Sequence, residues 1–189
     1  MNVRESGMPE ECEWSTFFNP IDILKTMALS DQTQDVADFG CGYGTFTMPA
    51  ARITSGTVYA IDIDPEMIMA VKKKMLDKAV TNVITMRRDI LHEGSGLVDE
   101  NVDYVLLFNI LHTKCPVKLL KEVYRILRKN GSVAIINWNL NLKTPRGPPV
   151  EIRPSLEQCK EWCVKSGFNP NSAKAYDFKP YHYGLVMKK

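Results

Sequence analysis

The sequence lacks the features of secreted and membrane-spanning proteins. No uninterrupted apolar run approaches the roughly 20 residues that a membrane-spanning helix requires. The first residues, MNVRESGMPEECEW, are acidic where a signal peptide needs an apolar core. Cysteine is scarce, with five residues and no C-x-x-C pair, which disfavours a disulfide framework and indicates reduced thiols. These absences together predict a cytoplasmic protein without a membrane anchor.

A strong excess of either charge is also absent. The 24 Lys and Arg residues nearly balance 22 Asp and Glu residues, and the net charge of +2 makes a nucleic acid partner unlikely on charge alone. Internal repeats and low-complexity segments are absent as well. The length of 189 residues, of which 44% are hydrophobic, favours a single domain over 1–189 with a buried core.

Short apolar strands alternate with helical segments from Asp35 onwards. Strands are expected at 36–39, 57–62, 82–86, 102–108 and 132–138, and helices at 45–53, 65–76 and 116–129. This alternation predicts βαβ units and a parallel sheet with helices on both sides. Two further strands at 173–178 and 182–187 are joined by a short KPY link, which favours an antiparallel hairpin.

Other segments flank this alternating pattern. Residues 1–30 are expected to form an N-terminal cap segment, in which Asn19 caps a helix, Pro20 opens it, and Ala28 lies on its apolar face. The Lys72–Lys74 run is interpreted as the solvent-exposed face of a later helix.

An inserted loop is expected after the fifth strand. Residues 139–154 contain KTPRGPP, which disfavours regular structure. Ser155 and Gln158 then have the spacing of a capping box for a helix that ends near Gly167. On this helix Cys159 and Cys163 share a face, and we interpret both as buried small side chains and predict no metal site.

Polar residues follow three of the predicted strands, at the edge where open α/β sheets bind ligands. The turn after the first strand is DFGCGYG, residues 38–44, and its glycines permit positive φ and close approach of a ligand. Asp62 ends the second strand, where a carboxylate can accept hydrogen bonds from two ribose hydroxyls. Asp89 follows the third strand, where it can accept from the exocyclic amine of adenine. Together these strand ends predict a pocket for an adenosine-containing cofactor.

The details of the glycine-rich turn distinguish between adenosine cofactors. A dinucleotide fingerprint reads G-x-G-x-x-G, but the third glycine position counted from Gly40 holds Thr45. Asp38 would repel a pyrophosphate, whereas it suits a ligand that carries an ammonium group. S-adenosylmethionine carries such a group together with a sulfonium cation.

These motifs resemble those of the class I S-adenosylmethionine-dependent methyltransferases over most of the chain, about 35–187. DFGCGYG is similar to the first family motif, IDIDP (61–65) to the second, RRDIL (87–91) to the adenine segment and DYVLLFNILH (103–112) to the fourth-strand motif. The resemblance implies an α/β fold, a Rossmann-like three-layer sandwich. Its seven-stranded, mostly parallel sheet has the order 3-2-1-4-5-7-6, and its last strand is antiparallel.

The resemblance also implies a set of cofactor-binding residues. They are Asp38, Gly40, Cys41, Gly42, Gly44, Asp62, Ile63, Asp89, Ile90 and Asn109. Within the class, the LH pair before a leucine-rich helix is most similar to the group of ubiquinone/menaquinone-biosynthesis and arsenite methyltransferases. The activity implied is methyl transfer to a small-molecule acceptor. Alternatives are an RNA or protein methyltransferase that needs a partner, a catalytically inactive S-adenosylmethionine-binding scaffold and, more distantly, a nicotinamide-dependent oxidoreductase; the oligomeric state stays open.

Residues near the acceptor are predicted from their chemistry. His112 and His182 are candidate catalytic general bases for an acceptor that must lose a proton, since imidazole titrates near neutral pH. Each also has a purely structural interpretation, as a residue that fills space beside a helix or along a strand. Four aromatic residues are predicted to line an apolar acceptor pocket, with packing as the alternative: Trp14, Phe18, Trp138 and Tyr181.

Overall fold

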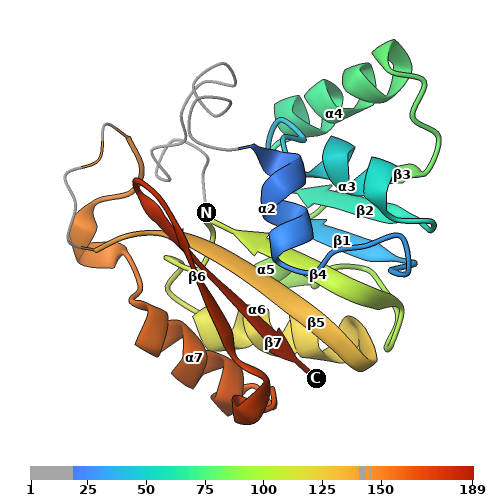
Figure 1. Ribbon diagram of the computed structural model, residues 1–189. Helices are drawn as coiled ribbons and strands as arrows, with labels where there is room; N and C mark the ends of the chain where they lie inside the picture. The colour runs from blue at the N-terminus through green and yellow to red at the C-terminus, as the bar shows by residue number, and fades with distance from the viewer. Residues whose placement is uncertain (1–18, 141–143, 145) are drawn as a thin grey trace.

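The computed structural model describes residues 19–140, 144 and 146–189 (Figure 1). Its strands are β1 (Val36–Phe39), β2 (Val58–Asp62), β3 (Val83–Arg87), β4 (Val102–Phe108), β5 (Leu127–Trp138), β6 (Lys174–Phe178) and β7 (His182–Lys188). Its helices are α2 (Pro20–Thr26), α3 (Thr47–Ile53), α4 (Pro65–Asp77), α5 (Ile90–Glu93), α6 (Pro116–Ile126) and α7 (Leu156–Lys165), with short 3₁₀ helices η2 (Val150–Ile152) and η3 (Pro170–Ser172). None of the described helices is long and apolar enough to cross a membrane.

The seven strands of the described residues belong to one sheet with the order β3-β2-β1-β4-β5-β7-β6, which confirms the predicted fold class. The pairs β1–β2, β1–β4, β2–β3 and β4–β5 are parallel. Strand β7 runs antiparallel to both of its neighbours, β5 and β6. The carboxyl ends of the parallel strands therefore meet at one edge of the sheet, and the start of β7 joins them there.

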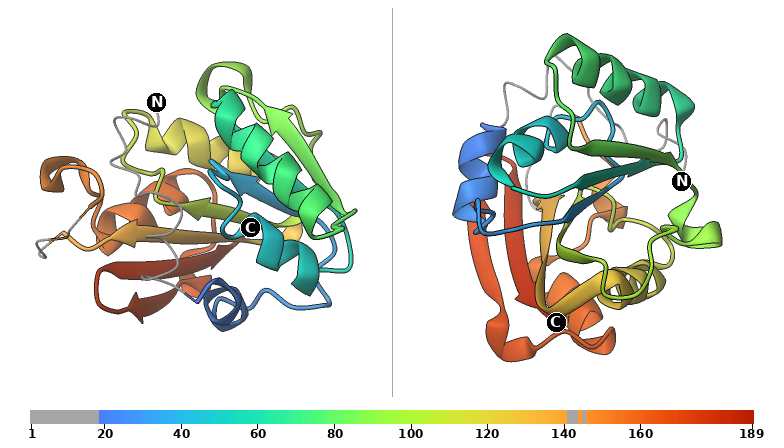
Figure 2. Two further views of the ribbon diagram at one scale, coloured as in Figure 1. Left: turned by 90° about the horizontal axis from the view of Figure 1, so that it is seen from above. Right: turned by 90° about the vertical axis from the view of Figure 1, so that its right-hand side faces the viewer.

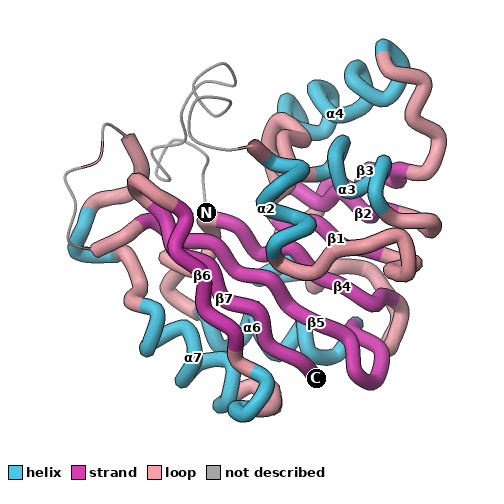
Figure 3. Tube along the Cα trace, viewed as in Figure 1, coloured by secondary structure: helices cyan, strands magenta, loops and turns pink. Residues whose placement is uncertain are grey.

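Helices cover both faces of the sheet and complete the three layers (Figures 2 and 3). One buried cluster packs α2, α3 and α4 against one face, where β4 contributes Tyr104 and Leu106. The other cluster packs α6 and α7 against the opposite face, where β4 contributes Val105 and Leu107. Because β4 is buried on both sides from Tyr104 to Phe108, its sequence is apolar over these five residues instead of alternating.

The boundary between α6 and β5 differs from the prediction. Helix α6 ends at Ile126, not at Lys129, and Leu127 already has an extended backbone that pairs with Val102 of β4. The apolar spacing of the helix continues through Leu127, whose side chain is fully buried. Burial alone does not distinguish a last helical turn from a first strand residue, so the prediction extended the helix too far.

The predicted start of α2 is confirmed, but its predicted apolar face is wrong at one position. Asn19 accepts a hydrogen bond from the backbone of Asp22, as an N-cap does. The helix ends at Thr26, and Ala28 lies beyond it with φ +69°, outside the helical face. The predicted capping box of Ser155 and Gln158 is present at the start of α7.

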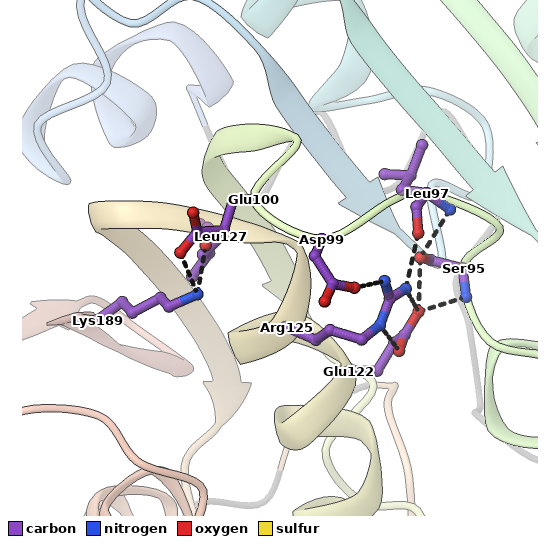
Figure 4. A network of polar contacts seen from close by, with 8 residues as sticks. All are labelled: Ser95, Leu97, Asp99, Glu100, Glu122, Arg125, Leu127 and Lys189. Carbon is purple, nitrogen blue, oxygen red and sulfur yellow. Dashed lines mark hydrogen bonds and ion pairs between the residues drawn. The ribbon is translucent and has the colours of Figure 1, made fainter.

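A polar network holds the segment between α5 and β4 against α6 (Figure 4). Glu122 Oε1 accepts hydrogen bonds from the backbone N–H of Ser95 at 2.8 Å and from its hydroxyl at 2.6 Å. Arg125 donates to Glu122, to Asp99 at 2.6 Å and to the carbonyl of Leu97 at 2.7 Å. This network lies at the amino edge of the parallel strands, opposite the edge where the predicted site residues gather.

Candidate functional site

The turn after β1 depends on glycine for its conformation. Gly40, Gly42 and Gly44 have φ values of +68°, +51° and +78°, in the left-handed region that glycine adopts without strain. The N–H of Gly40 donates to the carbonyl of Ile61 at 2.8 Å, which ties the turn to the end of β2. A Cβ atom at Gly40 would lie 2.8 Å from Cγ2 of Ile110, so a larger residue does not fit. The turn therefore presents bare backbone at the carboxyl edge of the sheet.

Asp62 fastens this turn to the next one. One carboxylate oxygen accepts the N–H of Gly42 at 2.9 Å, and the other accepts the N–H of Asp64 at 3.0 Å. The side chain is only 7% exposed, and burial raises its pKa while the backbone donors act against that shift. A carboxylate has four acceptor positions on its two oxygens, so these backbone donors leave room for a ligand hydroxyl.

Asp38 is the second buried carboxylate of the site. It is 3% exposed and accepts a hydrogen bond from the hydroxyl of Thr47 on α3 at 2.6 Å. Burial raises its pKa to about 7, with a smaller opposing effect of the Thr47 bond and a further rise from the charge of Asp62. Within the described residues, no Lys or Arg pairs with Asp38 or Asp62. Two buried carboxylates without a cation suit a positively charged ligand better than a pyrophosphate.

The backbone groups of Cys41 and Ile63 hold these turns in place, and their contact with a cofactor stays a prediction. The N–H of Cys41 donates to the carbonyl of Ile61 at 3.1 Å. Its thiol is buried, and burial raises its pKa, so it stays protonated at neutral pH. The carbonyl of Ile63 accepts from Nε of Arg87 at 3.4 Å, which links the turn after β2 to the end of β3.

Asp89 is the N-cap of α5, two residues after the end of β3. Its Oδ1 accepts the N–H groups of Leu91 at 3.1 Å and His92 at 3.3 Å, so the side chain caps the helix. Its Oδ2 contacts Nδ1 of His92 at 2.8 Å. The neighbouring Ile90 is half-buried and packs against the second apolar cluster. The acid therefore lies at the predicted strand end in a fixed orientation.

Two polar atoms after β4 are buried without a hydrogen-bond partner in the described part of the chain: Oδ1 of Asn109 and Nε2 of His112. Asn109 has φ +56°, and its N–H extends the ladder to β5 by donating to Ile136 at 2.7 Å. Burial lowers the pKa of His112 to about 4, so its ring is neutral at pH 7. Leaving a buried polar group unpaired costs about 1–3 kcal/mol, which a ligand at this strand end would offset.

Aromatic and basic side chains cluster where β5 and β7 meet. Trp138 is 2% exposed, and its ring centroid lies 4.0 Å from that of His182 and 6.3 Å from that of Tyr181. The guanidinium of Arg153 lies 5.7 Å from the centre of the indole and donates to the carbonyl of Asn139 at 3.0 Å. Arg153 thus links Asn139 to the described residues 146–154 beside Trp138, and these residues include the short helix η2, which the sequence did not predict.

His182 has the least accessible position of the two candidate bases. It is 1% exposed, and burial, with the charge of Arg153, lowers its pKa to about 3. This environment favours a packing role against Trp138, while its catalytic role stays a prediction. Trp14 and Phe18 lie outside the described residues, so their predicted contact with an acceptor also stays a prediction.

The sequence did not reveal several residues that are distant along the chain but contact the glycine-rich turn. Lys74 of α4 donates from Nζ to the carbonyl of Tyr43 at 2.6 Å, so its interpretation as purely solvent-exposed is wrong. Thr47 and Ile110 touch Asp38 and Gly40, respectively. No local pattern reveals such contacts, because they depend on how α3, α4 and the turn after β4 pack. Cys159 and Cys163 are both buried, as interpreted, and the described residues contain no cluster of three or more His, Cys, Asp or Glu suited to a metal.

Comparison with known proteins agrees with this geometry. The methyltransferase domain family matches residues 36–131, which is 96 of the 189 residues. A crystal structure of a SAM-dependent methyltransferase from Aquifex aeolicus is similar with a TM-score of 0.81 and 24% identity, covering 96% of this chain and 94% of that one. At that identity the likeness shows the fold alone.

Relatives by sequence include proteins with different names. An uncharacterized methyltransferase-like protein of Schizosaccharomyces pombe is 31% identical over 59% of this chain and 40% of its own length. A ribosomal protein L11 methyltransferase of Thermotoga neapolitana is 29% identical over 73% and 47%, and a tRNA U34 carboxymethyltransferase of Campylobacter jejuni is 26% identical over 84% and 57%. The chain thus spans about half the length of these relatives. On the family match and the shared fold, the chain belongs to the methyltransferase domain family, among the class I S-adenosylmethionine-dependent methyltransferases.

Proposed function

We propose that this chain binds S-adenosylmethionine at the carboxyl edge of β1, β2 and β3 and transfers its methyl group to a small-molecule acceptor. The observation that carries the proposal is the pair of buried carboxylates, Asp38 and Asp62, beside a glycine-rich turn and without a cationic partner in the described residues. Asp38 would hold the ligand ammonium group and Asp62 the ribose hydroxyls. Asp89 would accept from the adenine amine.

The chain's own groups supply orientation and proton handling. When bound, S-adenosylmethionine supplies a methyl group already activated by its sulfonium centre. The protein then needs to align an acceptor and exclude water, and well-oriented intramolecular reactions show effective molarities of about 10⁵–10⁸ M. His112 is the favoured base, because its buried Nε2 is unpartnered in the described residues and its ring is neutral at pH 7. The same burial that keeps the ring neutral makes it a weaker base than an exposed imidazole, so its role depends on its position beside the acceptor hydroxyl. Asn109, three residues earlier, stays a predicted cofactor contact, and its buried Oδ1, unpartnered in the described residues, can accept a hydrogen bond from the ligand.

The aromatic cluster supports an apolar acceptor near β5. Trp138 and Tyr181 lie at the same sheet edge as His112, and the guanidinium of Arg153 lies over the indole of Trp138. The finer similarity to ubiquinone/menaquinone-biosynthesis and arsenite methyltransferases, and the cytoplasmic location, stay predictions. So does the extent of a single domain over 1–189.

A macromolecular acceptor is the second candidate. Two relatives are named for ribosomal protein L11 and for tRNA U34, and this chain spans only part of their length. Recognition of such an acceptor would need a further segment or a partner protein. An inactive scaffold that only binds the cofactor is separated from both by an assay of methyl transfer.

Calorimetry with S-adenosylmethionine, S-adenosylhomocysteine and NAD tests the binding proposal. We expect both sulfur ligands to bind and NAD not to bind. Asp62→Ala should weaken the binding of S-adenosylhomocysteine about 10-fold or more, since it removes a charged acceptor of two ribose hydroxyls. Asp64→Ala is the matched control: it removes the N-cap of α4, which lowers stability but leaves the proposed ribose contact intact. Binding of NAD alone, or an unchanged affinity of Asp62→Ala, would contradict the proposal.

A further inference from the structure

The Asp89 carboxylate is held at three points, and only one of its acceptor positions on Oδ2 is left for a ligand. Two backbone N–H groups of α5 occupy Oδ1, at 3.1 and 3.3 Å. The imidazole Nδ1 of His92 contacts Oδ2 at 2.8 Å. Because a carboxylate oxygen has two acceptor positions, the imidazole takes one on Oδ2 and leaves the other in a fixed direction.

The imidazole lies outside the cofactor motifs. His92 is one turn of helix beyond Asp89, and its side chain is 78% exposed, whereas that of Asp89 is 25% exposed. With Oδ2 as acceptor, Nδ1 is the donating nitrogen, which leaves Nε2 toward solvent. Partial burial raises the pKa of Asp89, but the side-chain and backbone hydrogen bonds from His92 outweigh it, and the net pKa is lowered. The acid is therefore ionised and acts only as an acceptor at neutral pH.

We propose that His92 is a positioning residue for adenine recognition: its Nδ1–H orients Oδ2 of Asp89 so that the remaining acceptor position receives the exocyclic amine of the cofactor. This inference rests on the proposed function, because it assumes that adenine lies against Asp89. Backbone capping fixes Oδ1 but leaves the carboxylate plane free to tilt about that anchor. The imidazole removes this freedom, and the amine then meets an acceptor that is already aligned.

The consequence is selectivity between ligands that differ only in the amine. The probes are S-adenosylhomocysteine and its 6-deamino analogue, in which hydrogen replaces the amine of the purine. Wild-type protein should bind the first more tightly. His92→Ala should weaken binding of S-adenosylhomocysteine about three- to tenfold, the range of one modest hydrogen bond, and should leave the deamino analogue unchanged. His92→Asn should restore most of the selectivity, because its side-chain N–H₂ can donate from a similar position.

The binding experiment is calorimetry of the full chain with both ligands. Glu93→Ala is the matched control, since it removes an exposed side chain from the same short helix without touching Asp89. Equal weakening of both ligands by His92→Ala would overturn the inference, because it would reveal only a loosened α5. Unchanged affinity for both would overturn it as well. If wild-type protein binds neither ligand, the proposed function itself fails. This outcome is read from the wild type alone, so it is distinct from the outcomes of the variants, which test only the role of His92.

Discussion

Asp38 is a carboxylate whose burial has consequences for ligand binding. Its only hydrogen bond in the described residues comes from Thr47, and its pKa is raised to about 7. At pH 6 the free protein therefore carries a mostly protonated Asp38. A ligand ammonium group prefers the ionised form, so binding below pH 7 must release a proton.

We expect the affinity for S-adenosylhomocysteine to rise with pH. Below pH 7 it should fall by up to about tenfold per pH unit, and near pH 8 it should level off. Calorimetry between pH 5.5 and 8 (about one point per half unit), in two buffers of different ionisation enthalpy, measures both the affinity and the released proton. Asp38→Asn should bind weakly with no pH dependence in this range. A flat profile for the wild type would contradict the assignment of the ammonium group to Asp38.

Ionisation of Asp38 favours ligand binding but lowers the stability of the folded protein. The pKa of Asp38 is higher in the folded state than its ordinary value of 3.8, so the unfolded chain loses the proton first as the pH rises. The fold therefore loses stability between about pH 4 and pH 7 through this group. Asp38→Asn should unfold at a higher temperature than wild type at pH 8, and this advantage should vanish near pH 4.

At the scale of elements, the segment between α5 and β4 has little regular structure of its own. Helix α5 spans four residues, and the chain then crosses to β4 without a further helix or strand. Its position depends on Glu122 and Arg125 of α6, which bind Ser95, Leu97 and Asp99 (Figure 4). A depression of about 480 Å³ adjoins this network at the amino edge, and its lining mixes acidic Asp99 with basic Lys121.

Glu122→Gln should destabilise the protein by about 1–3 kcal/mol at pH 7, because it removes the charge that Arg125 and Ser95 stabilise. Hydrogen bonds from Arg125 and Ser95 outweigh partial burial and lower the pKa of Glu122 from 4.5 to about 2. Ionised Glu122 therefore contributes its full stabilisation of the fold above pH 4.5, and this stabilisation is lost as the pH falls toward 2. Denaturant unfolding at pH 7 and pH 3 measures the free energy of unfolding of both proteins. The difference between wild type and Glu122→Gln should be smaller at pH 3.

Glu161→Gln serves as the control for this variant. Glu161 lies 3.9 Å from Lys165 on the surface of α7, and its side chain is 67% exposed. An exposed pair of this kind contributes little, so the control should change stability by less than about 0.5 kcal/mol. Equal effects of the two variants would show that the network does not hold the loop.

Elements with strong local signals were predictable from the sequence. Strand β4 matches its predicted range of 102–108, and the capping box at Ser155 forms as its spacing indicates. The glycine-rich turn was predictable because three glycines in five positions form a clear sequence pattern, and all three have positive φ. Where both interpretations buried the same side chain, as at Leu127, the sequence could not decide between helix and strand. Contacts such as Lys74 with Tyr43 join residues 31 positions apart and depend on tertiary packing.

At the scale of the whole molecule, the two edges of the sheet hold different kinds of residues. The carboxyl edge carries Asp38, Asp62 and Asp89, together with buried polar atoms that lack partners in the described residues. At the amino edge, polar groups pair with one another, as Arg128 does with Asp35 and Asp103 at 2.8 Å. Satisfied polar groups stabilise, whereas unsatisfied ones mark where a ligand fits.

At the scale of the whole molecule, the class of methyl acceptor is tested by an assay of methyl transfer. Transfer of labelled methyl from S-adenosylmethionine to a cell extract, separated into small molecules, RNA and protein, should place the label in the small-molecule fraction. His112→Ala should lower turnover about 10²-fold or more, because it removes the group that accepts the acceptor's proton, while S-adenosylhomocysteine affinity stays unchanged. His182→Ala should mainly lower stability, since its ring packs on Trp138. Label in RNA or protein would favour a macromolecular acceptor, and unchanged turnover of His112→Ala would remove this imidazole from the mechanism.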